Sequence, residues 1–143
     1  MVFIRDEGSE FDVPLEAVWA YLNAPERHAS AHHHRAVRRT SLGENSGEYS
    51  WEQDFEGSST RFTMRWSSLH PVGISYQVLE GPFQGSRFLL TYHPKGAKTG
   101  VSIMGEFMSP TLPPDRIAAA VESFFSTEFE QDLRALRERP DPR

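Results

Sequence analysis

The stretch VPLEAVWAYLNAPE, residues 13–26, determines how the rest of the chain is interpreted. Pro14 suits the first turn of a helix, where its missing N–H leaves no hydrogen bond unmade. Asp12 is a candidate cap for that turn, and Trp19 lies on the apolar face of the helix. The sequence therefore predicts one short helix here, followed by a second from residue 25 to about residue 32.

The segments on either side of these helices have the pattern of strands. Residues 2–11 predict a strand before the helices. Alternating apolar and polar positions predict further strands after them. These later strands are expected around residues 35–42, 49–55, 62–66, 72–78, 88–92 and 101–107. Short turns rich in Gly and Pro separate them, which indicates an antiparallel sheet with one solvated face.

The chain closes with a long amphipathic helix, predicted from Pro114 to about Glu138, with Pro140 after its end. Its apolar residues recur in steps of three and four, which places them on one stripe. They are Ile117, Val121, Phe124, Phe125, Phe129, Leu133 and Leu136. A helix of about 25 residues spans roughly 37 Å, enough to cross the whole sheet. We therefore expect an α+β fold in which a curved sheet grips this helix.

Composition limits both the organisation and the partners of the chain. Its 143 residues fit a single domain, residues 1–143, with a real core. The net charge is −5, and the one basic cluster, residues 34–39, is too small to indicate nucleic-acid binding. The absence of cysteine excludes disulfides and thiolate chemistry. No signal-peptide pattern or membrane-length apolar run is present, so we expect a cytoplasmic protein without membrane insertion.

Two of these segments resemble a known family. Residues 13–26, with a proline-led helix, a central Val-Trp pair and a Pro-Glu turn, resemble the opening of SRPBCC superfamily proteins. Residues 129–136 resemble the closing helix of that superfamily, which includes START domains, polyketide cyclase/dehydrase-like proteins and birch-pollen-allergen-like proteins. The resemblance implies the helix-grip fold: a seven-stranded antiparallel curved sheet wrapped on the C-terminal helix, two short helices after strand one, and a hydrophobic cavity. It implies no single function, because members carry lipids, bind hormones or pigments, cyclise polyketides or act as subunits of complexes.

Strand parity places a set of mostly aromatic side chains opposite the long helix. The candidate ligand-binding residues are Trp51, Gln53, Phe62, Met64, Trp66, Tyr76, Tyr92, Phe124, Phe125 and Phe129. An ordinary filled core would show the same pattern, and the resemblance is what favours a cavity. Gln53 lies on the apolar face, where it either bonds a neighbouring tyrosine as a satisfied core group or orients a ligand.

Four histidines gather in and after the second short helix. His28 and His32 are four residues apart, which puts both rings on one helical face, and His33 and His34 follow. The intervening sequence, Ala-Ser-Ala, contains no carboxylate to complete a metal site. We therefore predict that these histidines belong to a solvated helix and loop and hold no structural metal.

The sequence assigns no catalytic residue and no cofactor. Groups able to polarise a carbonyl or move a proton are present. They are Gln53, Tyr76, Tyr92, His93 and Glu106. No spacing indicates a nucleophile with its base and acid, and no phosphate-binding loop is present. Whether the protein is an enzyme is left open.

Three functions fit these patterns. The first is binding of a small hydrophobic or aromatic ligand, lipid-like or polyketide-like, between sheet and helix. The second is a cyclase or dehydratase-like enzyme acting on an aromatic polyketide-type substrate. The third is a protein-interaction module, with a protein partner that the sequence does not identify. Pocket polarity separates the first two, because converging polar groups favour catalysis and an apolar lining favours binding.

Overall fold

The computed structural model describes residues 1–138, and Pro140 lies outside the described residues. The strands are β1 (Val2–Phe11), β2 (Arg35–Gly43), β3 (Ser46–Phe55), β4 (Ser58–Leu69), β5 (Gly73–Glu80), β6 (Arg87–Lys95) and β7 (Lys98–Phe107). The helices are α1 (Leu15–Leu22), α2 (Pro25–Ala31) and α3 (Pro114–Arg137). Within residues 1–138, no helix combines the length and the apolar character that crossing a membrane requires.

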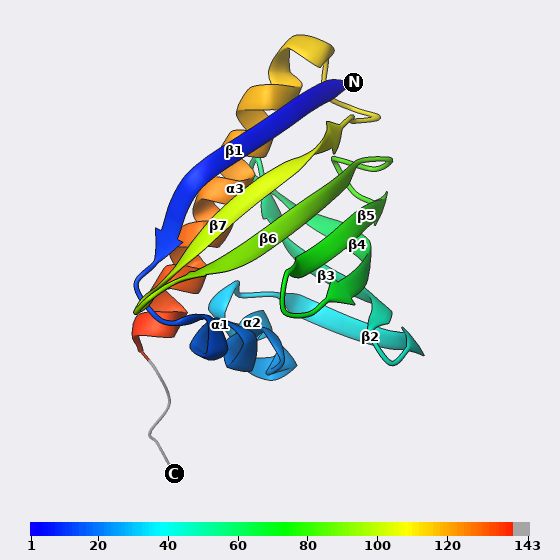
Figure 1. The fold of residues 1–143 in the computed structure, drawn as a ribbon. Helices are drawn as coiled ribbons and strands as arrows, with labels where there is room; N and C mark the ends of the chain where they lie inside the picture. Colours follow the sequence, from blue (N-terminus) through cyan, green and yellow to red (C-terminus); the bar gives the residue numbers. More distant parts are fainter. Residues whose placement is uncertain (139–143) are drawn as a thin grey trace.

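All seven strands form one antiparallel sheet with the order β1-β7-β6-β5-β4-β3-β2. Figure 1 shows the sheet curving around α3, which runs along its inner face. The apolar stripe predicted for α3 is buried against the sheet, with Val121 1% exposed. The predicted α+β helix-grip fold, with two short helices after strand one, is therefore confirmed.

The connection between β1 and β2 explains the position of the two short helices. These strands lie at opposite edges of the sheet, so the chain must cross from one edge to the other between them. Helices α1 and α2 make this crossing and contact the C-terminal half of α3 (Figure 1). The Tyr21 hydroxyl donates to Asp132 Oδ1 at 2.6 Å, and Arg27 Nη2 donates to the Ala135 carbonyl at 2.9 Å. One side chain of α1 and one of α2 are thereby held against α3.

The interior contains two hydrophobic clusters along α3. The first surrounds Phe124, which packs against Phe62 and Phe83 with centroid distances of 5.5 and 5.7 Å. The second lies near the short helices and includes a stack of Phe11 on Phe129 at 4.9 Å. Tyr76 and Leu90 pack against both clusters and join them along the sheet.

Two local expectations are wrong. Asp12 does not cap α1, which begins after Pro14 without a side-chain cap. Its carboxylate instead accepts a hydrogen bond from Arg137 Nε at 2.9 Å, tying the start of α1 to the end of α3. Val72, expected at the start of a strand around residues 72–78, instead precedes β5 and is 59% exposed, because it belongs to the turn before that strand.

Candidate functional site

A cavity of about 600 Å³ lies between the inner face of the sheet and α3. Its walls come from both hydrophobic clusters and from α2, so it occupies the space that the clusters leave between them. Most of the lining side chains are aromatic or aliphatic, contributed by alternate positions of β3 to β7. Polar groups gather where α2 meets α3 and where β2 and β3 join.

Eight of the ten candidate ligand-binding residues line this cavity. They are Trp51, Met64, Trp66, Tyr76, Tyr92, Phe124, Phe125 and Phe129. Strand parity brings the first five together, and the helical spacing of three and four brings the last three to meet them. That these side chains contact a ligand remains a prediction.

The other two candidates do not line the cavity. Gln53 lies behind Trp51, whose Nε1–H donates to Gln53 Oε1 at 2.7 Å. Phe62 is fully buried and stacks on Trp51 with ring centroids 5.1 Å apart. The broad indole of Trp51 therefore separates both residues from the cavity, and the partner of the Gln53 amide is a tryptophan rather than a tyrosine.

One end of the cavity is polar and is built by two helices. The four-residue spacing on α2 places the rings of His28 and His32 together, with centroids 4.6 Å apart. Asp132 of α3 faces both: its Oδ1 lies 2.8 Å from His32 Nε2 and 3.8 Å from His28 Nε2. His32 is only 3% exposed, so this cluster belongs to the cavity wall and not to a solvated helix.

Further groups of α3 surround His32. Gln131 Oε1 lies 2.6 Å from His32 Nδ1, and Glu128 Oε1 lies 3.5 Å from the same atom. The sequence argument against a metal assumed that no carboxylate supports these histidines, and this premise is wrong. The carboxylates come from a helix about a hundred positions further along the chain, which only the fold brings near.

The charges of this cluster shift the pKa values in opposite directions. Burial lowers the pKa of His28 to about 4 despite the nearby Asp132. Burial also acts against protonation of His32, but its hydrogen bond to Asp132 and the charge of Glu128 outweigh burial and raise its pKa to about 9. Burial raises the pKa of Glu128 to about 7. The cluster thus combines a neutral imidazole, an imidazolium and a carboxyl group that titrates near neutrality.

His34 forms a second polar point in the cavity wall. Its ring stacks on Trp51 with centroids 4.5 Å apart, and its Nδ1 lies 2.7 Å from the Tyr49 hydroxyl oxygen. Its Nε2 is buried and has no partner of hydrogen-bonding geometry among residues 1–138, although the nearby Gln53 side chain acts to raise the pKa of this ring. Burial, followed by the charges of His32 and His28, lowers the pKa of His34 to about 2, so the ring is neutral.

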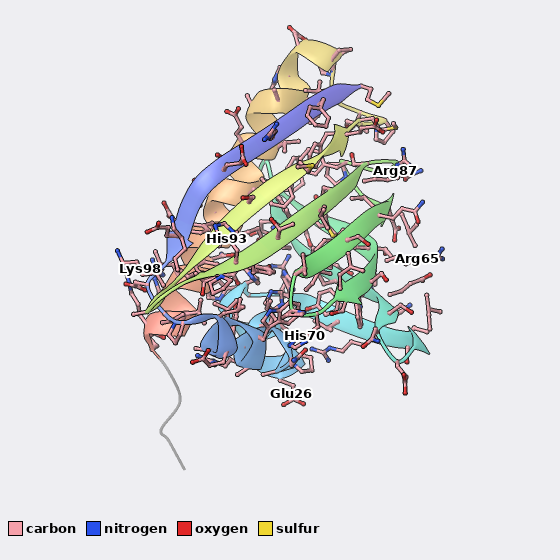
Figure 2. The ribbon with its side chains drawn as sticks, in the orientation of Figure 1. Glu26, Arg65, His70, Arg87, His93 and Lys98 are labelled. Atoms are coloured by element: carbon pink, nitrogen blue, oxygen red, sulfur yellow. The ribbon has the colours of Figure 1, made fainter. Side chains whose placement is uncertain are left out.

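The candidates for acid–base chemistry divide between the inside and the outside of the cavity. Tyr76 and Tyr92 line it, and burial raises the pKa of both hydroxyls well above the ordinary value. His93 is exposed on β6, whereas His70 lies beside the short helices against Trp19 (Figure 2). Glu106 pairs with Arg87 at 3.0 Å and does not line the cavity.

Glu128 and Asp132 are the functional candidates that the sequence analysis missed. Neither was named as a candidate site residue. Their spacing nevertheless matches the apolar stripe of the helix. Glu128 comes four residues after Phe124, and Asp132 comes three residues after Phe129. Carboxylates at core-facing positions are the sequence signal that pointed to a polar site.

No protein-family model and no curated protein matches the chain. Solved structures do. The Zhui aromatase/cyclase from Streptomyces sp. R1128 is 17% identical with a TM-score of 0.72, over 94% of this chain and 92% of that one. Ara h 8.0201 is 9% identical with a TM-score of 0.76, over 96% and 99%. A START superfamily protein from Mycobacterium smegmatis is 12% identical with a TM-score of 0.71, over 95% and 97%.

These similarities extend over nearly the whole of each chain, and at such low identities they concern the fold. They include representatives of the cyclase-like, allergen-like and START-like groups to which the sequence motifs pointed. The chain thus has the helix-grip fold that these solved structures share.

Proposed function

We propose that the protein binds a small hydrophobic or aromatic ligand, lipid-like or polyketide-like, in the cavity between the sheet and α3. The observation that carries this proposal is the cavity itself, about 600 Å³ with largely aromatic walls. Protein interiors are close-packed, and ligand pockets typically measure about 300–1,000 Å³. A space of this size inside a small fold is suited to holding a molecule.

The polar atoms in the wall indicate what kind of ligand fits. His34 Nε2 is buried without a partner among the described residues. Tyr76 and Tyr92 border the same space, so their hydroxyls are further candidates to bond a ligand. A buried polar group without a partner costs roughly 1–3 kcal/mol. A ligand with an apolar body and one or two hydrogen-bonding groups would satisfy these atoms.

A second function is favoured by the polar end of the cavity. His28, His32, Glu128 and Asp132 all line it, beside the apolar space. A carboxyl group with a pKa of about 7, such as that of Glu128, is well suited to general acid–base catalysis. The aromatase/cyclase that shares this fold is consistent with such chemistry. The alternative is therefore a cyclase or dehydratase-like enzyme acting on an aromatic polyketide-type substrate.

Native mass spectrometry of the untagged protein, purified from its own cells, tests the binding proposal. We expect a population that carries one additional small apolar molecule, which solvent denaturation releases. Incubation of the released molecule with the purified protein then separates the two functions, because an enzyme converts the molecule and a binding protein returns it unchanged. Protein that carries nothing and takes up none of the apolar molecules of its own cell extract would contradict the proposal.

A further inference from the structure

We propose that His28, His32 and Asp132 bind a zinc ion at the polar end of the cavity. These three residues offer one ligand atom each, and the three atoms lie within 4.8 Å of one another. Two imidazoles and one carboxylate are a ligand set that zinc accepts. All three residues line the cavity, so the ion would face the space where a ligand fits.

Two of the three pairs of ligand atoms require only a small adjustment, and the third pair, His28 with His32, lies within 4.8 Å. Ligands on a tetrahedral zinc ion, with bonds of about 2.1 Å, are roughly 3.4 Å apart. His28 Nε2 lies 3.8 Å and His32 Nε2 lies 2.8 Å from Asp132 Oδ1. The ion would take the place of the proton that joins His32 to Asp132. The first distance would shorten and the second would lengthen, each by about half an ångström.

The groups behind these ligands already orient them as outer-shell partners do. The amide oxygen of Gln131 can only accept a hydrogen bond, so the Nδ1 of His32, 2.6 Å away, carries the hydrogen. This arrangement directs the Nε2 of His32 toward the proposed ion. The Tyr21 hydroxyl donates to Asp132 Oδ1 at 2.6 Å and fixes that carboxylate. Such supporting bonds are typical of ligating histidines and carboxylates.

Charge also favours a cation here. The carboxylates of Asp132 and Glu128 both adjoin the cluster, and among residues 1–138 their only ion-pair partners are histidines. Two guanidinium groups lie near the cluster, and neither pairs with these carboxylates: that of Arg39 lies over the Tyr49 ring and donates to the Pro25 carbonyl, and that of Arg27 lies over the Tyr21 ring and donates to the Ala135 carbonyl. A divalent ion that replaces the proton of His32 would balance the charges of the two carboxylates.

Three protein ligands leave one zinc coordination position open. In this cluster that position would be available to water or to an oxygen atom of a bound molecule. The inference goes beyond the proposed function and does not depend on it, because zinc binding is measured without any organic ligand. Its failure would leave the apolar cavity, and the binding proposal, unaffected.

The direct test is calorimetric titration of ZnCl₂ into the untagged full-length protein after treatment with a chelator and dialysis. We expect one equivalent to bind with micromolar or tighter affinity. In the wild-type protein, ring-nitrogen NMR signals of His28 and His32 should shift on zinc addition, while those of the exposed His33 and His93 should not. Titration with CoCl₂ should give the intense visible bands of a low-coordinate cobalt site.

Variants test the ligand assignment. Loss of a residue that only supports a metal ligand typically weakens metal affinity by roughly 10- to 100-fold. His28→Ala and Asp132→Asn each remove a ligand, so each should weaken zinc affinity by more than that. The loss of zinc affinity in Gln131→Ala should lie within that roughly 10- to 100-fold range, because this variant removes only the side chain that supports His32. The matched control is His33→Ala, which removes an exposed histidine from the same run and should bind zinc as the wild type does.

Two results would overturn the inference. One is the absence of zinc binding at concentrations up to about 100 µM, with no shift of the His28 and His32 signals. The other is binding that His33→Ala weakens as strongly as Asp132→Asn does, which would indicate an exposed histidine site. The NMR readout uses the wild-type protein, so it decides the question even where a variant fails to fold.

Discussion

The indole N–H of Trp51 donates to the side-chain oxygen of Gln53, two residues further along β3, at 2.7 Å. Trp51 is 3% exposed and forms part of the cavity wall, whereas Gln53 stands behind it. The amide therefore fixes the orientation of the indole, and the indole presents its ring to the cavity. The polar group on this apolar face is a structural partner of the wall.

Gln53→Leu should consequently reduce stability more than binding. The change leaves the buried Trp51 N–H without its acceptor, which should lower the free energy of unfolding by about 1–3 kcal/mol. Affinity for an apolar probe such as 1-naphthol should change less than threefold. Chemical denaturation and calorimetry measure the two effects. The control is Gln77→Leu on β5, where the amide is exposed. A tenfold loss of affinity in Gln53→Leu, without loss of stability, would show that the amide contacts the ligand.

Phe62 and Phe125 provide a matched pair for locating the cavity. Phe62 is fully buried in the core, whereas Phe125 is partly exposed and lines the cavity. Phe62→Ala should lower the free energy of unfolding by about 3–5 kcal/mol, and Phe125→Ala by roughly 1–3 kcal/mol, because Phe125 has packing neighbours on fewer sides. Urea denaturation measures both. Equal losses would indicate that Phe125 is packed as completely as Phe62.

Two buried tyrosines test the link between α1 and α3. The Tyr21 hydroxyl donates to Asp132 at 2.6 Å, whereas no side-chain hydrogen bond contributes to the pKa shift of Tyr92. Tyr21→Phe should cost about 1.5–3 kcal/mol, the range for a hydrogen bond to a charged group, and Tyr92→Phe less than about 1 kcal/mol. Thermal unfolding of the two variants measures the difference. A larger loss in Tyr92→Phe would contradict the assigned hydrogen bonds.

The sequence predicted the fold because its local signals agree with one another. The proline-led helix at residues 13–26, the alternation along β3 and the apolar stripe of α3 each specify one element. Their order leaves little choice of topology, since consecutive hairpins put β2 to β7 side by side. Of the eight predicted side chains that line the cavity, five follow from the strand alternation and three from the helical spacing of α3.

The polar end of the cavity could not be predicted in this way. Its parts lie on α2 and α3, about a hundred residues apart, and the crossing from β1 to β2 is what brings them together. The spacing of Glu128 and Asp132 places them beside the apolar stripe of α3, but the helix alone does not show that the histidines of α2 face them. The partner of Gln53 was also missed, because a contact between residues on the same face of one strand depends on side-chain orientation as well as parity.

The central claim is that the cavity holds a small apolar molecule, and a calorimetric titration with 1-naphthol tests it most directly. Val101→Phe places a larger side chain at a lining position, whereas Val72→Phe makes the same change at an exposed position outside the cavity. We predict one equivalent of 1-naphthol bound by the wild type, unchanged affinity in Val72→Phe, and at least tenfold weaker binding in a folded Val101→Phe. No binding by the wild type, or equal affinity in all three proteins, would contradict the account.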